Sequence, residues 1–162
     1  MSQTHFTCLC HYAYLYSSVY LYTHYTQEYG TTTARPRRCG WIDIPQLRYA
    51  IMVNGLTEIN LTKLDCLSGF EEVKIGVQYV DSTTGEVVTG MPASLTKYAN
   101  CKVTYESMPG WTEDISKMKT FAELPATCQA YVKRLEALLG MQIRWIGVGA
   151  GRLDLIDVGA LK

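Results

Sequence analysis

The sequence lacks three features that would assign it to a large class of proteins: a net charge, a long apolar run and a charged amino terminus. Its 15 basic residues are balanced by 15 acidic residues, and the pI is about 6.8. This balance excludes an overall field for nucleic acid or a membrane surface, so any anion site must be local. No run approaches the roughly 18 apolar residues of a membrane span, and no basic residue precedes Arg35. We therefore expect a cytoplasmic protein with neither a membrane nor a nucleic acid as partner.

The length and the cysteine distribution favour one intracellular domain. A chain of 162 residues can bury roughly 70% of its unfolded surface, which is enough for a hydrophobic core without covalent staples. The cysteines are scattered rather than grouped in a disulfide framework, which favours reduced thiols. They stand at positions 8, 10, 39, 66, 101 and 128.

Residues 1–26 differ in composition from the rest of the chain. They contain all three histidines and six of the twelve tyrosines, but no charged side chain apart from histidine. Alternating tyrosines have the period of a strand, yet an unpaired strand of this kind is a liability in water. We expect an extension outside the fold of residues 27–162. The alternative is a metal site at Cys8, Cys10, His11 and His24, although this spacing is not a usual zinc pattern.

From residue 40 onward the pattern predicts an alternating α/β domain. Residues 40–57 read as a helix, with Asp43 as cap, Pro45 in the first turn and Gly55 near the end. The clearest helix covers residues 124–140, where apolar side chains recur at helical spacing and Gly140 stands at the expected C′ position. Strands are predicted in EINLTKLD, EEVKIGVQYV, CKVTYESMPGW and IRWIGVGAGR, with a turn at DSTTGE.

Two of these strands end in residues suited to binding a nucleotide. In TKLD, Asp65 could accept two parallel hydrogen bonds from guanine N1 and N2, and adenine lacks that donor pair. A buried carboxylate left unpaired by the wrong base costs roughly 1 to 3 kcal/mol. In GVGAGR, glycines could admit a flat or charged ligand near the backbone. Each stretch alone also fits an ordinary structural role, as a capped strand end or a turn.

The stretch TTTARPRRCGW, residues 31–41, concentrates positive charge in a neutral chain. Arg35, Arg37 and Arg38 repel one another. They therefore suit either a solvated surface patch or a loop around a phosphate or carboxylate, which planar guanidinium groups bind well.

Five stretches, taken in order, closely resemble the carboxyl-terminal part of the adenylosuccinate synthetase family. The resemblance covers about residues 27–158, in EYGTTTARPRRCGWIDIPQLRYA, NGLTEINLTKLDCLSG, YESMPGW, LPATCQAYVKRLEALLG and IRWIGVGAGR. It implies an α/β fold with a central, mostly parallel sheet flanked by helices, as in P-loop-NTPase-like ligases. It also implies a homodimeric cytoplasmic enzyme of AMP biosynthesis that joins IMP to L-aspartate using GTP, with Mg²⁺ as cofactor.

The resemblance implies binding roles for two groups of residues. The family loop for L-aspartate and IMP corresponds to Thr31, Thr32, Thr33, Ala34, Arg35, Pro36 and Arg37. Within it, Arg35 would lie between aspartate and the IMP ribose, Arg37 would reach GTP, and Arg38 would support the loop. The guanine-binding residues of the family correspond to Lys63, Leu64, Asp65, Gly147, Val148 and Gly149.

The sequence departs from the family pattern in two ways. Ala34 replaces the glycine of T-T-G-R, which would cost about 1 kcal/mol if that position requires a positive φ. The family's phosphate loop, G-D-E-G-K-G, and a downstream catalytic histidine do not occur in this chain. They carry the general base, a magnesium ligand and the general acid, so the resemblance implies no catalytic and no metal-binding residue here.

Without these groups we expect the isolated polypeptide to be inactive, because large contributions to the rate would be missing. We also expect it to be poorly soluble, since sheet edges and apolar surface would lack their covering elements. Three interpretations are compatible with the sequence. The chain is a fragment of an active ligase, a non-catalytic guanine-nucleotide-binding module, or a partner that completes a separate amino-terminal chain.

Overall fold

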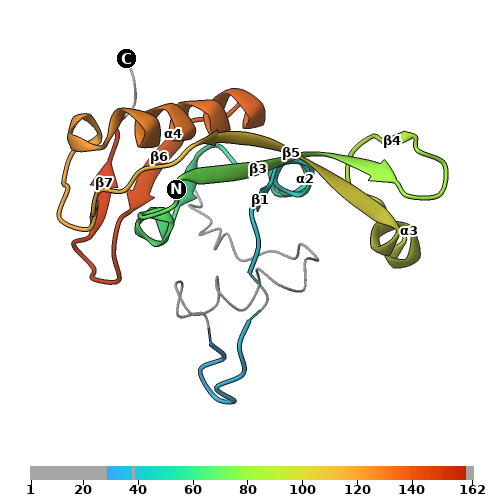
Figure 1. Cartoon of the computed structure of the whole chain (residues 1–162), viewed down its shortest axis with the longest axis horizontal. Coiled ribbons are helices and arrows are strands. Elements are labelled where there is room, and N and C mark those ends of the chain that lie inside the picture. Colours follow the sequence, from blue (N-terminus) through green and yellow to red (C-terminus); the bar gives the residue numbers. More distant parts are fainter. Residues whose placement is uncertain (1–28, 38, 160–162) are drawn as a thin grey trace.

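The fold is an α/β arrangement of two small sheets flanked by helices (Figure 1). The structure is a computed structural model that describes residues 29–37 and 39–159. The predicted extension, 1–26, with its alternative metal ligands, and Arg38 lie outside the described residues. The strands are β1 (Ile42–Asp43), β2 (Ile59–Leu61), β3 (Glu72–Asp81), β4 (Val87–Val88), β5 (Cys101–Pro109), β6 (Ile143–Gly147) and β7 (Leu155–Asp157). The helices are α2 (Ile44–Asn54), α3 (Leu95–Ala99) and α4 (Ala126–Leu139), with the 3₁₀ turns η1 (Leu64–Leu67) and η2 (Phe121–Glu123).

The α/β class is confirmed, but the strand directions in this chain are mixed rather than mostly parallel. β1–β3 and β2–β6 are parallel, whereas β3–β4, β3–β5 and β6–β7 are antiparallel. The physical reason lies in the connections. The segments between β1 and β3 and between β2 and β6 contain the longer helices α2 and α4, whereas short connections lead directly from β3 to β4 and from β6 to β7 and reverse the chain. β3 also pairs antiparallel with β5 from Glu72 to Asp81, with one register shift, although β4 and α3 lie between the two strands in the chain.

Both predicted helices begin and end at the residues that the sequence indicates. Asp43 Oδ1 accepts a hydrogen bond from the Gln46 N–H at the start of α2, and Gly55 closes that helix in the left-handed region at φ +58°. Gly140 closes α4 in the same way at φ +66°. Val53 contributes to the apolar pattern of α2 but is 60% exposed. Ile44 is the one residue of this helix that is fully buried.

One hydrophobic core joins the two sheets. α4 packs against α2 and β5, and α2 packs against β3, so the helices cover the sheets as Figure 1 shows. The core draws on strands, helices and η1; its most deeply buried members include Leu64, Val73, Ile75, Ile115, Cys128, Leu135, Ile143, Ile146, Val148 and Ile156. Burial of this much apolar surface holds the two parallel pairs in place.

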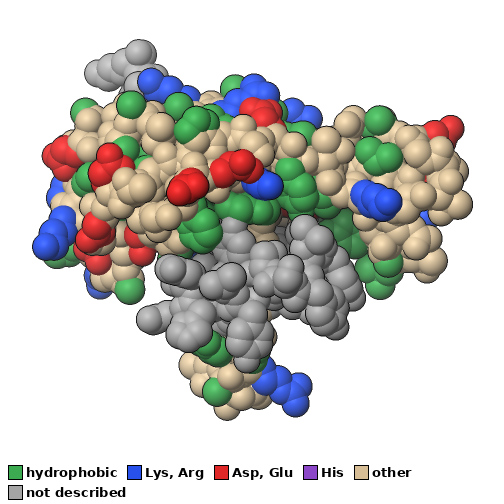
Figure 2. All heavy atoms as spheres, viewed as in Figure 1, with side chains coloured by type: hydrophobic (Ala, Val, Ile, Leu, Met, Phe, Trp, Pro, Cys, Tyr) green, Lys and Arg blue, Asp and Glu red, His purple; other side chains and the backbone are tan. Residues whose placement is uncertain are grey.

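The thiols and the surface of the described part agree with the composition. Its four cysteines, Cys39, Cys66, Cys101 and Cys128, form no disulfide with one another. Figure 2 shows basic and acidic side chains interspersed on the face in view, rather than a field of one sign. Within residues 29–37 and 39–159, no helix is long and apolar enough to cross a membrane.

Candidate functional site

The structure brings together the two strand tips that the sequence singles out. β2 and β6 are parallel neighbours, with Leu61 opposite Ile146, so the carboxyl ends of both strands lie at the same edge of the sheet. A Cβ at Gly147 would lie 3.3 Å from Thr62 Cα and 3.5 Å from Lys63 N. The two tips therefore touch through their backbones, at the carboxyl ends of parallel strands where α/β folds bind ligands.

The first tip turns sharply at Lys63. This residue has φ +61°, in the left-handed region, and begins the 3₁₀ turn η1. Leu64 is only 1% exposed and belongs to the core. The turn thus buries the Leu64 side chain in the core and holds the following residue, Asp65, half-buried at the tip of the strand.

Asp65 carries the most informative polar atom of the site. Its Oδ1 is buried and has no hydrogen-bond partner among the described residues. Burial raises the pKa of this carboxyl above its ordinary value, and the Asp65 backbone N–H, the charge of Lys63 and the Cys66 backbone N–H counteract that rise in part. Because buried polar atoms are normally hydrogen-bonded, an orphan carboxylate oxygen at a strand tip suits a donor supplied by a ligand.

The second tip is a loop, residues 147–154, between β6 and β7. Val148 is fully buried, and its N–H donates to Asp154 O at 2.9 Å. The Gly151 N–H donates to Asp154 Oδ2 at 2.8 Å. Asp154 and its partner Lys119, which donates to Oδ1 at 3.2 Å, are absent from the residues that the sequence singled out. The only signal in the sequence is that Asp154 stands three residues after Gly151, a spacing typical of a turn that an aspartate side chain closes.

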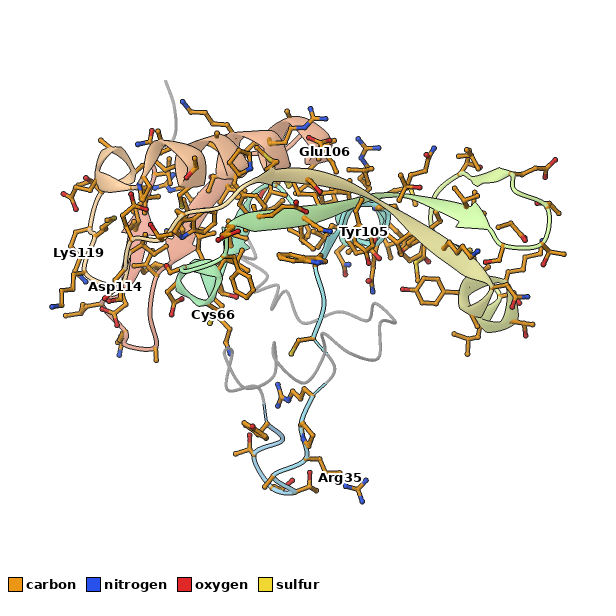
Figure 3. All side chains as sticks on the ribbon, viewed as in Figure 1. Arg35, Cys66, Tyr105, Glu106, Asp114 and Lys119 are labelled. Atoms are coloured by element: carbon orange, nitrogen blue, oxygen red, sulfur yellow. The ribbon has the colours of Figure 1, made fainter. Side chains whose placement is uncertain are left out.

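The basic stretch forms a separate hairpin. Tyr29 and Pro36 pair as an antiparallel bridge, the Gly30 N–H donates to Arg35 O, and the Ala34 N–H donates to Gly30 O, each at 2.8 Å. All residues from 31 to 37 are exposed. Figure 3 shows Arg35 at the outer end of this hairpin, which projects away from the sheets. The structure therefore groups residues 63–65 with residues 147–149, but it does not bring residues 31–37 against them.

Ala34, which replaces the glycine of the family pattern, has a positive φ. Its φ is +50°, in the region where L-residues other than glycine are uncommon. Because this position has a positive φ, alanine is expected to cost about 1 kcal/mol relative to the family's glycine.

The described residues offer no cluster for a metal ion. Among positions 29–37 and 39–159, no three His, Cys, Asp or Glu side chains lie close enough to hold one. These residues therefore offer no set of side chains that would hold Mg²⁺ without other ligands.

Comparisons with known proteins agree with this geometry. The profile of the family Adenylosuccinate synthetase matches residues 19–156, so the match begins within the tyrosine-rich segment. Adenylosuccinate synthetase of Phaeodactylum tricornutum is 56% identical over 132 residues, which are 82% of this chain and 25% of the relative. The chloroplastic enzyme of Chlamydomonas reinhardtii is 53% identical over 129 residues, 80% of this chain and 28% of the relative.

A solved structure extends the likeness to the fold. Fully ligated adenylosuccinate synthetase from Plasmodium falciparum superposes with a TM-score of 0.85 at 38% identity, over 95% of this chain and 36% of that one. The chain spans about a quarter of the length of the curated relatives it matches. From the profile, the identities and the fold together, this chain belongs to the adenylosuccinate synthetase family.

Proposed function

We propose that this chain supplies the guanine-recognition site and the aspartate loop of an adenylosuccinate synthetase. The complete reaction joins IMP to L-aspartate with GTP and yields adenylosuccinate, GDP and phosphate, a step of AMP biosynthesis. The observation that carries the proposal is the buried, unpartnered Asp65 Oδ1 at one strand tip beside the glycine loop of the adjacent tip. A guanine base presents two donors on one edge, and a carboxylate can accept both.

The binding roles divide between the two strand tips and the hairpin. Asp65 accepts from guanine, the Lys63 stem lies along the base, and the backbone of Gly147, Val148 and Gly149 packs against it. Since Leu64 and Val148 are buried in the core, both contribute through the backbone. In the hairpin, the hydroxyls and N–H groups of residues 31–33 bind the aspartate carboxylates, and the exposed guanidinium groups of Arg35 and Arg37 suit carboxylate and phosphate oxygens.

The hairpin must approach the strand tips to take part. Its exposed position, held by the bridge between Tyr29 and Pro36, makes it a movable arm rather than part of the core. Closure over a bound substrate would complete the site and exclude water, as loops of many enzymes do. Homodimerisation, Mg²⁺ and a cytoplasmic location belong to this proposal; the Chlamydomonas relative is chloroplastic. We expect nucleotide binding, rather than turnover, from the isolated chain.

A calorimetric titration with nucleoside diphosphates tests the proposal. The unmodified chain is expected to bind GDP and to reject ADP, which lacks the donor pair. Asp65→Asn should weaken GDP binding about 10- to 100-fold, the equivalent of roughly 1 to 3 kcal/mol. It should improve binding of xanthosine diphosphate, because the new amide can donate to the xanthine O2.

The matched control is Asp114→Asn, at an exposed carboxylate near Asp65. It should leave GDP affinity unchanged. Acidification provides a second signature. Since burial raises the pKa of Asp65, GDP binding should weaken as the pH falls through that pKa, and Asp65→Asn should remove this dependence. Equal affinity for GDP and ADP would contradict the proposal.

Ala34→Gly is expected to favour the closed turn of the hairpin. The alanine adopts φ +50° at a cost of about 1 kcal/mol, which glycine avoids. Hydrogen exchange at the Ala34 and Gly30 amides should therefore slow about fivefold. In a complete enzyme that carries this loop, the glycine form should also have the lower KM for L-aspartate. A KM in the alanine form that is no higher would contradict a role of this position in aspartate binding.

A further inference from the structure

The loop of residues 147–154 is folded around the carboxylate of Asp154. Three hydrogen bonds close it: the Gly151 N–H to Asp154 Oδ2 at 2.8 Å, the Asp154 N–H to Gly151 O at 3.0 Å, and the Val148 N–H to Asp154 O at 2.9 Å. The carboxylate thus receives one N–H of the loop directly, and the backbone of the same residue fixes the end of β6.

The same carboxylate explains two of the glycines. A Cβ at Gly149 would lie 2.8 Å from Asp154 Oδ2, and a Cβ at Gly151 would lie 2.6 Å from it. Neither glycine has a positive φ, so their backbone conformations do not require glycine. They are needed because Asp154 fills the space on the inner side of the loop. The glycines therefore serve the internal turn.

A lysine from a distant segment holds this carboxylate. Lys119 Nζ donates to Asp154 Oδ1 at 3.2 Å and to Leu153 O at 3.0 Å. The segment of Lys119 is itself anchored, since the Lys119 N–H donates to Glu123 Oε2 at 2.8 Å and Ile115 is fully buried. Figure 3 shows Lys119 near the β6–β7 end of the molecule, on the same side as Asp114.

Lys119 and Asp154 are both partly exposed, so their ion pair should affect the loop more than the stability of the whole fold. The side chains of Lys119 and Asp154 are 53% and 32% exposed, so the ion pair adds little to global stability. The Gly151 hydrogen bond and then Lys119 lower the pKa of Asp154, which keeps it ionised at neutral pH. An exposed pair that closes a loop acts mainly on the shape of that loop.

We propose that Asp154 and Lys119 are positioning residues that hold the 147–154 loop in the shape that receives the guanine base. The inference rests on the proposed function, because the base is the ligand of that site. It adds two residues that touch the loop rather than the nucleotide. Preorganisation of the loop lowers the ordering cost of binding, so their loss should weaken nucleotide affinity without unfolding the chain.

The test combines hydrogen exchange without nucleotide and GDP titration of the full chain. Asp154→Ala and Lys119→Met should each accelerate exchange at the Gly151 amide about three- to tenfold and raise the GDP Kd by a similar factor. Lys119→Arg should restore both values, because a guanidinium can donate to the same two oxygens. Lys117→Met, at an exposed lysine two residues away, is the matched control and should change neither.

The outcomes separate the inference from the proposed function. Unchanged Gly151 exchange in Asp154→Ala overturns the inference, whatever the nucleotide result. Faster exchange with unchanged GDP affinity also overturns it, because the loop shape would then not determine binding. If the unmodified chain fails to bind GDP while Asp154→Ala still accelerates exchange, the proposed function fails but the assignment of the loop-holding residues is supported. A fall in Tm that matches the loss of affinity would indicate a structural role only and would also overturn it.

Discussion

Gly110→Ala is expected to destabilise the fold by more than about 3 kcal/mol, enough to unfold much of the chain. A Cβ at Gly110 would lie 1.9 Å from Phe70 O and 2.8 Å from Phe70 C. Both are backbone atoms, so no side chain can turn away to make room. The two segments are also tied together, because the Gly110 N–H donates to Glu71 O at 2.9 Å.

The consequences of this change extend to the candidate site. The residue after Gly110 is Trp111, which is 2% exposed and whose Nε1–H donates to Ser68 Oγ at 3.2 Å. The Gly69 N–H donates to Trp111 O at 2.8 Å. Ser68 directly follows η1, the turn that carries Asp65. A displaced Gly110 would therefore also move the strand tip that carries Asp65.

Urea denaturation, followed by circular dichroism, measures this effect against a matched glycine. Gly140→Ala also replaces a glycine, but a Cβ at this position would have no atom within 4 Å among the described residues beyond its own helix and chain neighbours. Only its φ of +66° is unfavourable, so it should cost about 1 kcal/mol. Equal losses of stability for the two variants would mean that the close contact at Phe70 does not constrain the fold.

Asp43→Ala is expected to destabilise the chain by about 2 to 4 kcal/mol, because Asp43 performs two tasks. Its Oδ1 caps α2, and loss of such a cap costs about 1 kcal/mol. Its Oδ2 accepts the hydrogen bond of the Tyr79 hydroxyl, and loss of a hydrogen bond to a charged group costs about 1.5 to 3 kcal/mol. Tyr79 is fully buried, and burial and then Asp43 raise its pKa, so the hydroxyl remains a donor.

A double-mutant cycle separates the two tasks. Asp43→Asn keeps one oxygen that can cap α2, and its NH2 group can only donate to the Tyr79 hydroxyl oxygen, so this variant should still cost less than the alanine variant. Tyr79→Phe removes the hydroxyl, so the double variant Asp43→Ala/Tyr79→Phe should be more stable than the sum of the single losses predicts. Chemical denaturation gives the four free energies of unfolding. Strict additivity would show that the hydroxyl does not depend on Asp43.

Local features of the sequence predict much of this fold. Asp43, Pro45 and Gly55 delimit α2, and Gly140 ends α4, because caps and positive-φ glycines act within a few residues. Strand alternation predicts β3, the segment that forms β5 also reads as a strand, and the resemblance predicts the family. The strand directions were less accessible, since pairing depends on the lengths and paths of the connections.

The candidate site divides in the same way. The sequence by itself determined which residue types stand at the two strand tips and in the hairpin. These are the carboxylate of Asp65, the glycines at the end of β6 and after it, and the arginines of the hairpin. Only the tertiary structure decided that two of these groups meet, that Asp65 Oδ1 is buried with no partner in the described part of the chain, and that Lys119 reaches Asp154 across 35 residues of chain. The physical reason is range. Caps and turns are local interactions that a pattern records, whereas burial and close approach arise from segments that become neighbours only when the core forms.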